Sequence, residues 1–243
     1  MDLYTTTEAR RLRLGGAALV TGSLAFVALF GVLARLFDYP RVLARGAAQV
    51  LPRLAEGGDT LRAVWLLYAA LPGAIVYAGL ASRAMLARGG RRVRTVGVAA
   101  AVTAGAAMTL GLLRWSTLEW ELARAWATAG PAARDTLARA FATSNLVLGK
   151  LIGELVGEVA LATWFAALAV AHARSGRRAL AALGAVAAAL VVVAALRNVT
   201  PAVSAVAAVD NVTLPAWLLA LGVTFFRQGV ASERSRLQQR AER

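Results

Sequence analysis

The sequence predicts an all-α, polytopic membrane protein with about six transmembrane helices and short interfacial helices. Hydrophobic residues make up 59% of the 243 residues and charged residues only 16%, and the mean hydropathy is +0.62. These values are too apolar for a soluble domain of this length. Six apolar runs are also long enough to cross a hydrocarbon core of about 30 Å, and arginines gather at the ends of these runs.

Composition excludes several kinds of chemistry. Cysteine is absent, which removes disulfides, thiolate metal sites and cysteine nucleophiles. A single histidine, His172, cannot supply paired haem ligands or a histidine-rich metal centre. We therefore expect no cofactor and no metal site. The net charge of +14 follows the ends of the apolar runs rather than one surface, so it indicates membrane topology and no nucleic-acid partner.

The chain divides into one membrane domain and two short tails. We expect a cytoplasmic N-terminal tail over residues 1–13, a single six-helix transmembrane domain over 14–226, and a basic cytoplasmic C-terminal tail over 227–243. The predicted spans are about 14–36, 61–86, 93–113, 144–171, 179–196 and 212–226. The last span is short, so we expect either that residues 202–209 extend the helix or that the helix tilts in the membrane.

Proline and glycine mark the limits of the first two spans. Pro40 disfavours helix in the residue before it and ends the first span. Residues 41–56 have helical apolar spacing and predict a short interfacial helix that is disturbed by Pro52. Pro72 lies near the middle of the second span, where it predicts a kink.

The region after the third span is rich in tryptophan and charge. Trp115, Trp120 and Trp126 lie among acidic and basic residues, which is typical of an aromatic belt on an interfacial segment. A ligand surface is the alternative. Pro131, at a tolerated first-turn position, then begins an amphipathic segment that leads into the fourth span.

The arginine distribution predicts the orientation of the chain. Both tails and the loops at 83–94 and 172–178 together hold sixteen arginines and four acidic residues. The opposite side holds ten arginines and, apart from Glu154 and Glu158 of the fourth span, seven acidic residues. The positive-inside rule therefore predicts that both termini lie in the cytoplasm. The abundance of arginine and alanine is typical of a GC-rich bacterial genome, so we expect the protein in a bacterial cytoplasmic (inner) membrane.

The fourth span contains the strongest polar signal in the chain. Over residues 149–158, three glycines alternate with three charges at a spacing of four: Gly149, Gly153 and Gly157 with Lys150, Glu154 and Glu158. On an α-helix each set forms a slowly drifting stripe. We expect the glycines to pack against a neighbouring helix within the monomer rather than in a dimer, and the charges to need polar partners.

Each charge costs about 2.5–3.5 kcal/mol at the centre of a membrane helix. With an outer boundary near residue 146 and a rise of about 1.5 Å per residue, the three charges lie about 6, 12 and 18 Å deep. Lys150 reaches Glu154 at four residues. Glu158 must be protonated, hydrated in a cavity or paired with an arginine. Arg114 and Arg197 are the candidates, and we expect them to serve Glu154 more than Glu158.

Two functions fit this segment. The first is a polar intramembrane cavity for a small solute or for proton-coupled transport, lined by the three charges of residues 149–158. The second is a membrane-embedded accessory or regulatory protein in which a buried ion cluster fixes helix register. An arginine beside Glu158 would favour the second. No nucleophile motif accompanies Lys150, so enzymatic activity is the weaker expectation and no catalytic residue is predicted. The partners are the lipid bilayer and, through helix packing, a protein partner or a second copy.

Several short segments together resemble an uncharacterised bacterial six-helix inner-membrane family, one of the domain-of-unknown-function groups. They are Phe37-Asp38-Tyr39-Pro40 with Val42-Leu43, Gly57-Gly58, and Leu148-Gly149 to Gly153-Glu154 to Gly157. The resemblance covers roughly residues 15–230 and implies the six-helix topology without an activity. Where that family often has a polar residue after the glutamate, this chain has Leu155, so the resemblance implies no polar role at that position.

Overall fold

The computed structural model describes residues 4–241 and is built from helices, with no strand among these residues. Within them, six helical stretches are long and apolar enough to cross a membrane: Thr6–Phe37, Gly58–Ala81, Arg91–Thr128, Pro131–Arg174, Arg178–Asn198 and Val212–Gln239. The predicted all-α fold with six spans is therefore confirmed. The predicted tails extend to residues 1–3 and 242–243, which lie outside the described part of the chain.

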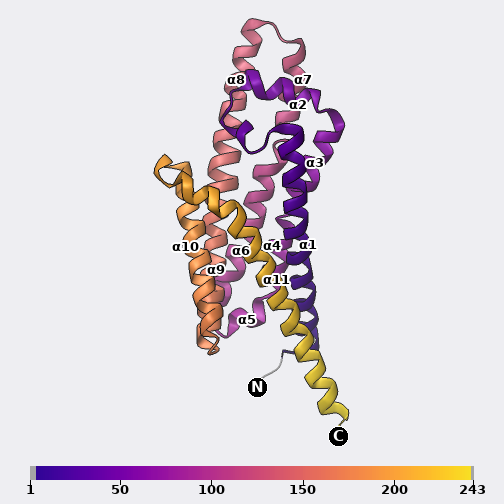
Figure 1. The fold of residues 1–243 in the computed structure, drawn as a ribbon, viewed down its shortest axis with the longest axis vertical. Coiled ribbons are helices and arrows are strands. Elements are labelled where there is room, and N and C mark those ends of the chain that lie inside the picture. Colours follow the sequence, from indigo (N-terminus) through magenta and orange to yellow (C-terminus); the bar gives the residue numbers. More distant parts are fainter. Residues whose placement is uncertain (1–3, 242–243) are drawn as a thin grey trace.

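The helices form one elongated bundle (Figure 1). In chain order they are α1 (Thr6–Phe37), η1 (Arg41–Ala44), α2 (Ala47–Glu56), α3 (Gly58–Ala70), α4 (Gly73–Ala81), α5 (Arg83–Ala87), α6 (Arg91–Leu113), α7 (Leu118–Thr128), α8 (Pro131–Ser144), η2 (Asn145–Val156), α9 (Gly157–Arg174), α10 (Arg178–Ala195), η3 (Leu196–Asn198), η4 (Pro201–Val203) and α11 (Ser204–Ala241). Both chain ends lie at one end of the bundle, whereas α2, α7 and α8 lie at the other.

Helix α1 begins earlier than the predicted start of the first span at residue 14. The Thr5 hydroxyl accepts a hydrogen bond from the Glu8 amide, and the Glu8 carboxylate accepts one from the Thr5 amide. This capping box satisfies two of the free amides at the helix start. The helix ends at Asp38, whose positive φ of 56° gives a left-handed cap just before Pro40.

The two prolines in the first half of the chain act differently. Pro72 lies between α3 and α4, at the position where a kink in the second span was predicted. Pro52, which was expected to disturb the interfacial helix, lies inside α2 without ending it. Val50, Leu51 and Leu54 of α2 are all fully buried, and we attribute the continuity of the helix to this packing, which offsets the one backbone hydrogen bond that proline removes.

Helix α11 is much longer than the predicted sixth span of 212–226. It begins at Ser204, in agreement with the expected extension through 202–209, and it continues through the basic C-terminal segment to Ala241. Its backbone is in close contact with that of α1. A Cβ added at Gly16 would lie only 2.5 Å from the Gly222 carbonyl oxygen. An ion pair of 2.6 Å between Arg13 and Glu233 joins the same two helices.

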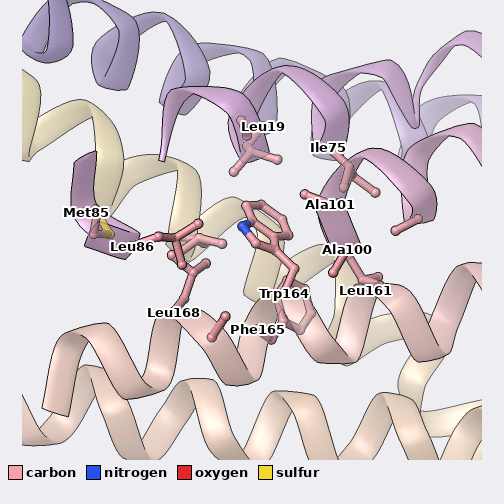
Figure 2. Close-up of a cluster of buried hydrophobic side chains, with 14 of the residues drawn as sticks. Leu19, Ile75, Met85, Leu86, Ala100, Ala101, Leu161, Trp164, Phe165 and Leu168 are labelled. Carbon is pink, nitrogen blue, oxygen red and sulfur yellow. The ribbon is translucent and has the colours of Figure 1, made fainter. Parts of the chain in front are cut away.

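One of two hydrophobic clusters fills the bundle on the side of the chain ends. Figure 2 shows the Trp164 ring at its centre, between side chains from α1, α4 and α6 that include Leu19, Ile75 and Ala101. Trp164 is fully buried, and its indole N–H donates to the Ser82 hydroxyl at 3.4 Å. This apolar packing closes the centre of the bundle at that level.

The second cluster is aromatic and lies toward α2 and α7. Trp65 stacks on Trp115 with ring centroids 5.0 Å apart, and Phe37 meets both rings edge-on. Trp115 is 1% exposed and Trp120 is 7% exposed. The predicted interfacial belt is therefore wrong for these two residues, because they are covered by α2 and by their neighbours instead of facing the membrane surface.

Candidate functional site

The polar segment of the fourth span is a π-helix rather than an α-helix. Residues Asn145–Val156 form this π-helix, η2, between α8 and α9. A π-helix closes its hydrogen bonds over five residues instead of four, and such segments occur frequently at functional sites. The spacing of four therefore does not produce straight α-helical stripes before Gly157, where α9 begins.

Arg197 joins the two glutamates. It lies in η3, directly after α10, and its guanidinium group forms a two-pronged contact with Glu158: Nη1 donates to Oε2 at 2.8 Å and Nη2 to Oε1 at 2.6 Å. The same Nη2 donates to Glu154 Oε2 at 3.0 Å. The expectation that the candidate arginines serve Glu154 more than Glu158 is wrong for Arg197, because the end of α10 lies level with both carboxylates.

Lys150 does not take part in this cluster. Its side chain is exposed, and it forms no hydrogen bond or ion pair with any residue of the described chain. The expected Lys150–Glu154 pair is absent because the wider turn of η2 removes the four-residue alignment on which it depended.

Arg114 belongs to a neighbouring buried network. Its Nε lies 3.7 Å from Glu119 Oε1, and its Nη2 donates to the Asn145 side chain at 3.0 Å. A further hydrogen bond runs to the Gly111 carbonyl oxygen. Glu119 is fully buried and also accepts a hydrogen bond from Ser144. Sequence reasoning assigned Glu119 to the interfacial segment and missed this network.

The three glycines of the motif face α6 and Arg114, the residue directly after α6. A Cβ added at Gly153 would lie 2.9 Å from the Gly111 Cα, so the two backbones are in direct contact. A Cβ at Gly149 would meet the Arg114 guanidinium at 2.8 Å, and one at Gly157 would meet Met108 at 2.8 Å. The small residues thus let η2 approach α6 closely within one chain.

Both glutamates also line a cavity of about 210 Å³. It lies between α1, α4, α6, η2 and α11, and most of its wall is apolar or aromatic. The polar side chains in its wall are Ser23, Tyr39, Tyr68, Arg114, Glu154, Glu158 and Arg197. Ser23 is 6% exposed, and its hydroxyl has no hydrogen-bond partner among the described residues.

Tyr39 brings a phenol close to the carboxylates. Burial, with a smaller contribution from the Glu154 carboxylate, raises the pKa of Tyr39 to about 12. The phenol is therefore neutral at physiological pH, and its ring meets that of Tyr68 edge-on with ring centroids 6.1 Å apart. Sequence analysis did not select Tyr39, Tyr68 or Ser23 as site residues. The one feature of the sequence that could have marked Tyr39 is its position directly before Pro40. The others could not be found in this way, because polar residues on different spans become neighbours only when the helices are packed.

Within the described residues, no group of three or more histidine, cysteine, aspartate or glutamate side chains could hold a metal ion. The fold and the cavity together define a polytopic helical membrane protein with a polar cluster between its spans. Residues 16–222 match the family described as a domain of unknown function, DUF4386. The chain therefore belongs to that family, which supports the predicted membership in a domain-of-unknown-function group. Comparisons with curated proteins and with solved structures gave no match.

Proposed function

We propose that this protein binds a small molecule with an apolar body and a polar group in the cavity between its helices. The observation that carries the proposal is that Glu154 and Glu158 lie at the wall of a largely apolar cavity of about 210 Å³. Ligand sites in proteins have this character, with an apolar wall and a few convergent polar groups.

The two carboxylates have different roles in this proposal. Both carboxylate oxygens of Glu158 accept a hydrogen bond from Arg197. This supports a structural role for Glu158 and agrees with the alternative function, in which a buried ion cluster fixes helix register. Glu154 receives only one hydrogen bond from Arg197, and its side chain is 30% exposed. We therefore propose that Glu158 and Arg197 hold the site in shape and that Glu154 contacts the ligand.

The apolar packing below the cavity supports binding rather than a continuous path for solute or protons. Leu19, Ile75 and Leu161 belong both to the cavity wall and to the cluster around Trp164. Figure 2 shows these side chains packed around the Trp164 ring, and Met85 and Leu86 of α5, at the end of the bundle where α1 begins, belong to the same cluster. The cavity is thus closed on that side, and we propose that the molecule enters from the opposite side or from the bilayer.

The depth of the cluster follows from the same helices. If His172 marks the inner boundary, a rise of about 1.5 Å per residue along α9 places Glu158 about 21 Å above it. Glu154 lies further out, in η2. In a core of about 30 Å, the two carboxylates then lie in the outer half.

We infer that both termini face the cytoplasm of a bacterial cell, because the arginine-rich loops lie at their end of the bundle. Reporter fusions test this orientation. A phosphatase that is active only outside the cytoplasm should be inactive when fused after Arg88 and active when fused after Gly130. The reverse pattern would overturn the orientation.

Filling the cavity tests the binding proposal. Ser23→Leu adds an apolar side chain at the cavity wall, whereas Thr21→Leu adds one on the exposed side of the same helix. We expect native mass spectrometry of the protein extracted from membranes to show a bound small molecule in the parent and in Thr21→Leu. The adduct should be lost, about tenfold or more, in Ser23→Leu.

The two variants also separate loss of binding from loss of fold. Thermal unfolding of Ser23→Leu, followed by tryptophan fluorescence, should show a cooperative transition like that of Thr21→Leu. An adduct that persists in a folded Ser23→Leu protein, or no adduct in the parent, would contradict binding in this cavity.

A further inference from the structure

We propose that the molecule bound in the cavity is a small monovalent organic cation, with its charged group beside Glu154 and its apolar body against the aromatic wall. This inference rests on the proposed binding function and adds the chemical class of the ligand. It is carried by the charge balance around the cavity, the unused bonding capacity of Glu154 and the composition of the wall.

Acidic groups outnumber basic groups around the cavity. Arg114 and Arg197 are the two arginines in its wall. Arg114 is paired with Glu119, which does not line the cavity, so Arg197 is the cation that Glu154 and Glu158 share. Two carboxyl groups therefore share one guanidinium group, and this excess favours a positively charged ligand.

The excess is accessible only at Glu154. Arg197 commits both terminal nitrogens to Glu158, so it gives Glu154 a single hydrogen bond, to Oε2. Glu154 Oε1 has no hydrogen-bond partner in the described part of the chain. Glu154 lines the cavity, and this oxygen can accept a hydrogen bond from an ammonium group or make an ionic contact with a quaternary one.

The wall suits an organic cation better than an inorganic ion. Electron-rich ring faces attract ammonium groups. Five aromatic side chains line the cavity: Phe26, Phe30, Tyr39, Tyr68 and Trp115. Leu19, Ile75 and Leu218 extend the apolar wall beyond them. A bare metal ion would leave this apolar volume empty, and residues 4–241 hold no cluster of metal-ligating side chains.

Ser23 adds an independent sign that the cavity holds a ligand. It is more than nine-tenths buried, lines the cavity and has no hydrogen-bond partner among the described residues. Buried hydroxyl groups are normally satisfied. A bound molecule or a water held with it would satisfy this hydroxyl.

Three ring compounds that differ in charge test the proposed class. The protein in nanodiscs is titrated with benzyltrimethylammonium, benzyl alcohol and phenylacetate, and the thermal unfolding midpoint is followed by tryptophan fluorescence. We expect only benzyltrimethylammonium to raise the midpoint. Glu154→Gln should weaken its apparent affinity by about tenfold, because one charge-assisted contact is lost.

Lys150→Gln is the matched control. It also changes one charge in η2, but Lys150 is exposed and outside the cavity wall, so the affinity should not change. A shift with benzyl alcohol or phenylacetate that Ser23→Leu abolishes would overturn the cation class and leave the binding function standing. A cation effect equal in the parent and in Glu154→Gln would overturn the role of Glu154. No shift with any compound would count against both proposals.

Discussion

Replacing Arg197 with methionine should lower the free energy of unfolding by about 3 kcal/mol, at the low end of the range for breaking a buried ion pair. The substitution leaves the carboxylates of Glu154 and Glu158 close together without their shared cation. We place the effect at the low end because the Arg197 side chain keeps 29% exposure and water screens the cluster in part. For a chain of this size the unfolding midpoint should fall by about 6–12 °C.

Two further variants identify the cause of that loss. Arg124→Met removes an exposed arginine from a surface pair with Glu121, so its cost should stay below about 1 kcal/mol. Adding Glu154→Gln and Glu158→Gln to Arg197→Met removes the uncompensated charges and should recover most of the stability. Equal effects of Arg197→Met and Arg124→Met would show that the cluster contributes little to the fold.

Substituting alanine for Gly111 should cost about 2–3 kcal/mol, because an added Cβ would lie 2.6 Å from the Gly153 Cα and 3.0 Å from the Leu148 carbonyl oxygen. Backbone atoms cannot rotate away as a side chain can, so α6 and η2 must separate. The cavity should change with them, since Gly111 and Gly153 both line it.

Gly31→Ala provides the control, because no atom lies within 4 Å of its added Cβ. In this α1 position alanine should be neutral or slightly stabilising, through its higher helix propensity. Unfolding midpoints of the two variants, measured in the same nanodiscs, make the comparison. Similar midpoints for Gly111→Ala and Gly31→Ala would contradict the close contact between α6 and η2.

The six spans could be predicted from the sequence because the bilayer leaves few alternatives. A chain without water around it must satisfy its backbone internally, so long apolar runs become helices. Local signals were less reliable where packing decides. Trp115 has the side chain of an interfacial residue, yet it is buried because Trp65 stacks on it.

The candidate site was only partly predictable. Glu154, Glu158 and Arg197 stand out because charges inside apolar runs are costly. Arg197 was a candidate partner of both glutamates, but its stronger contact with Glu158 was not predictable, since it depends on how far α10 is displaced along α9. Lys150 is not aligned with Glu154 because Asn145–Val156 is a π-helix, and no residue pattern marks a π-helix apart from an α-helix.

The contact between α1 and α11 has a consequence for biosynthesis. Gly16 meets the backbone at Gly222, and Gly229 meets it at Ala9, so α1 packs most extensively against a helix that is made much later. During synthesis, the small-residue face of α1 stays without that partner while the intervening spans enter the membrane. The bundle is completed only when α11 inserts. Quality-control factors that recognise unpaired membrane helices would therefore meet α1 in every unfinished chain.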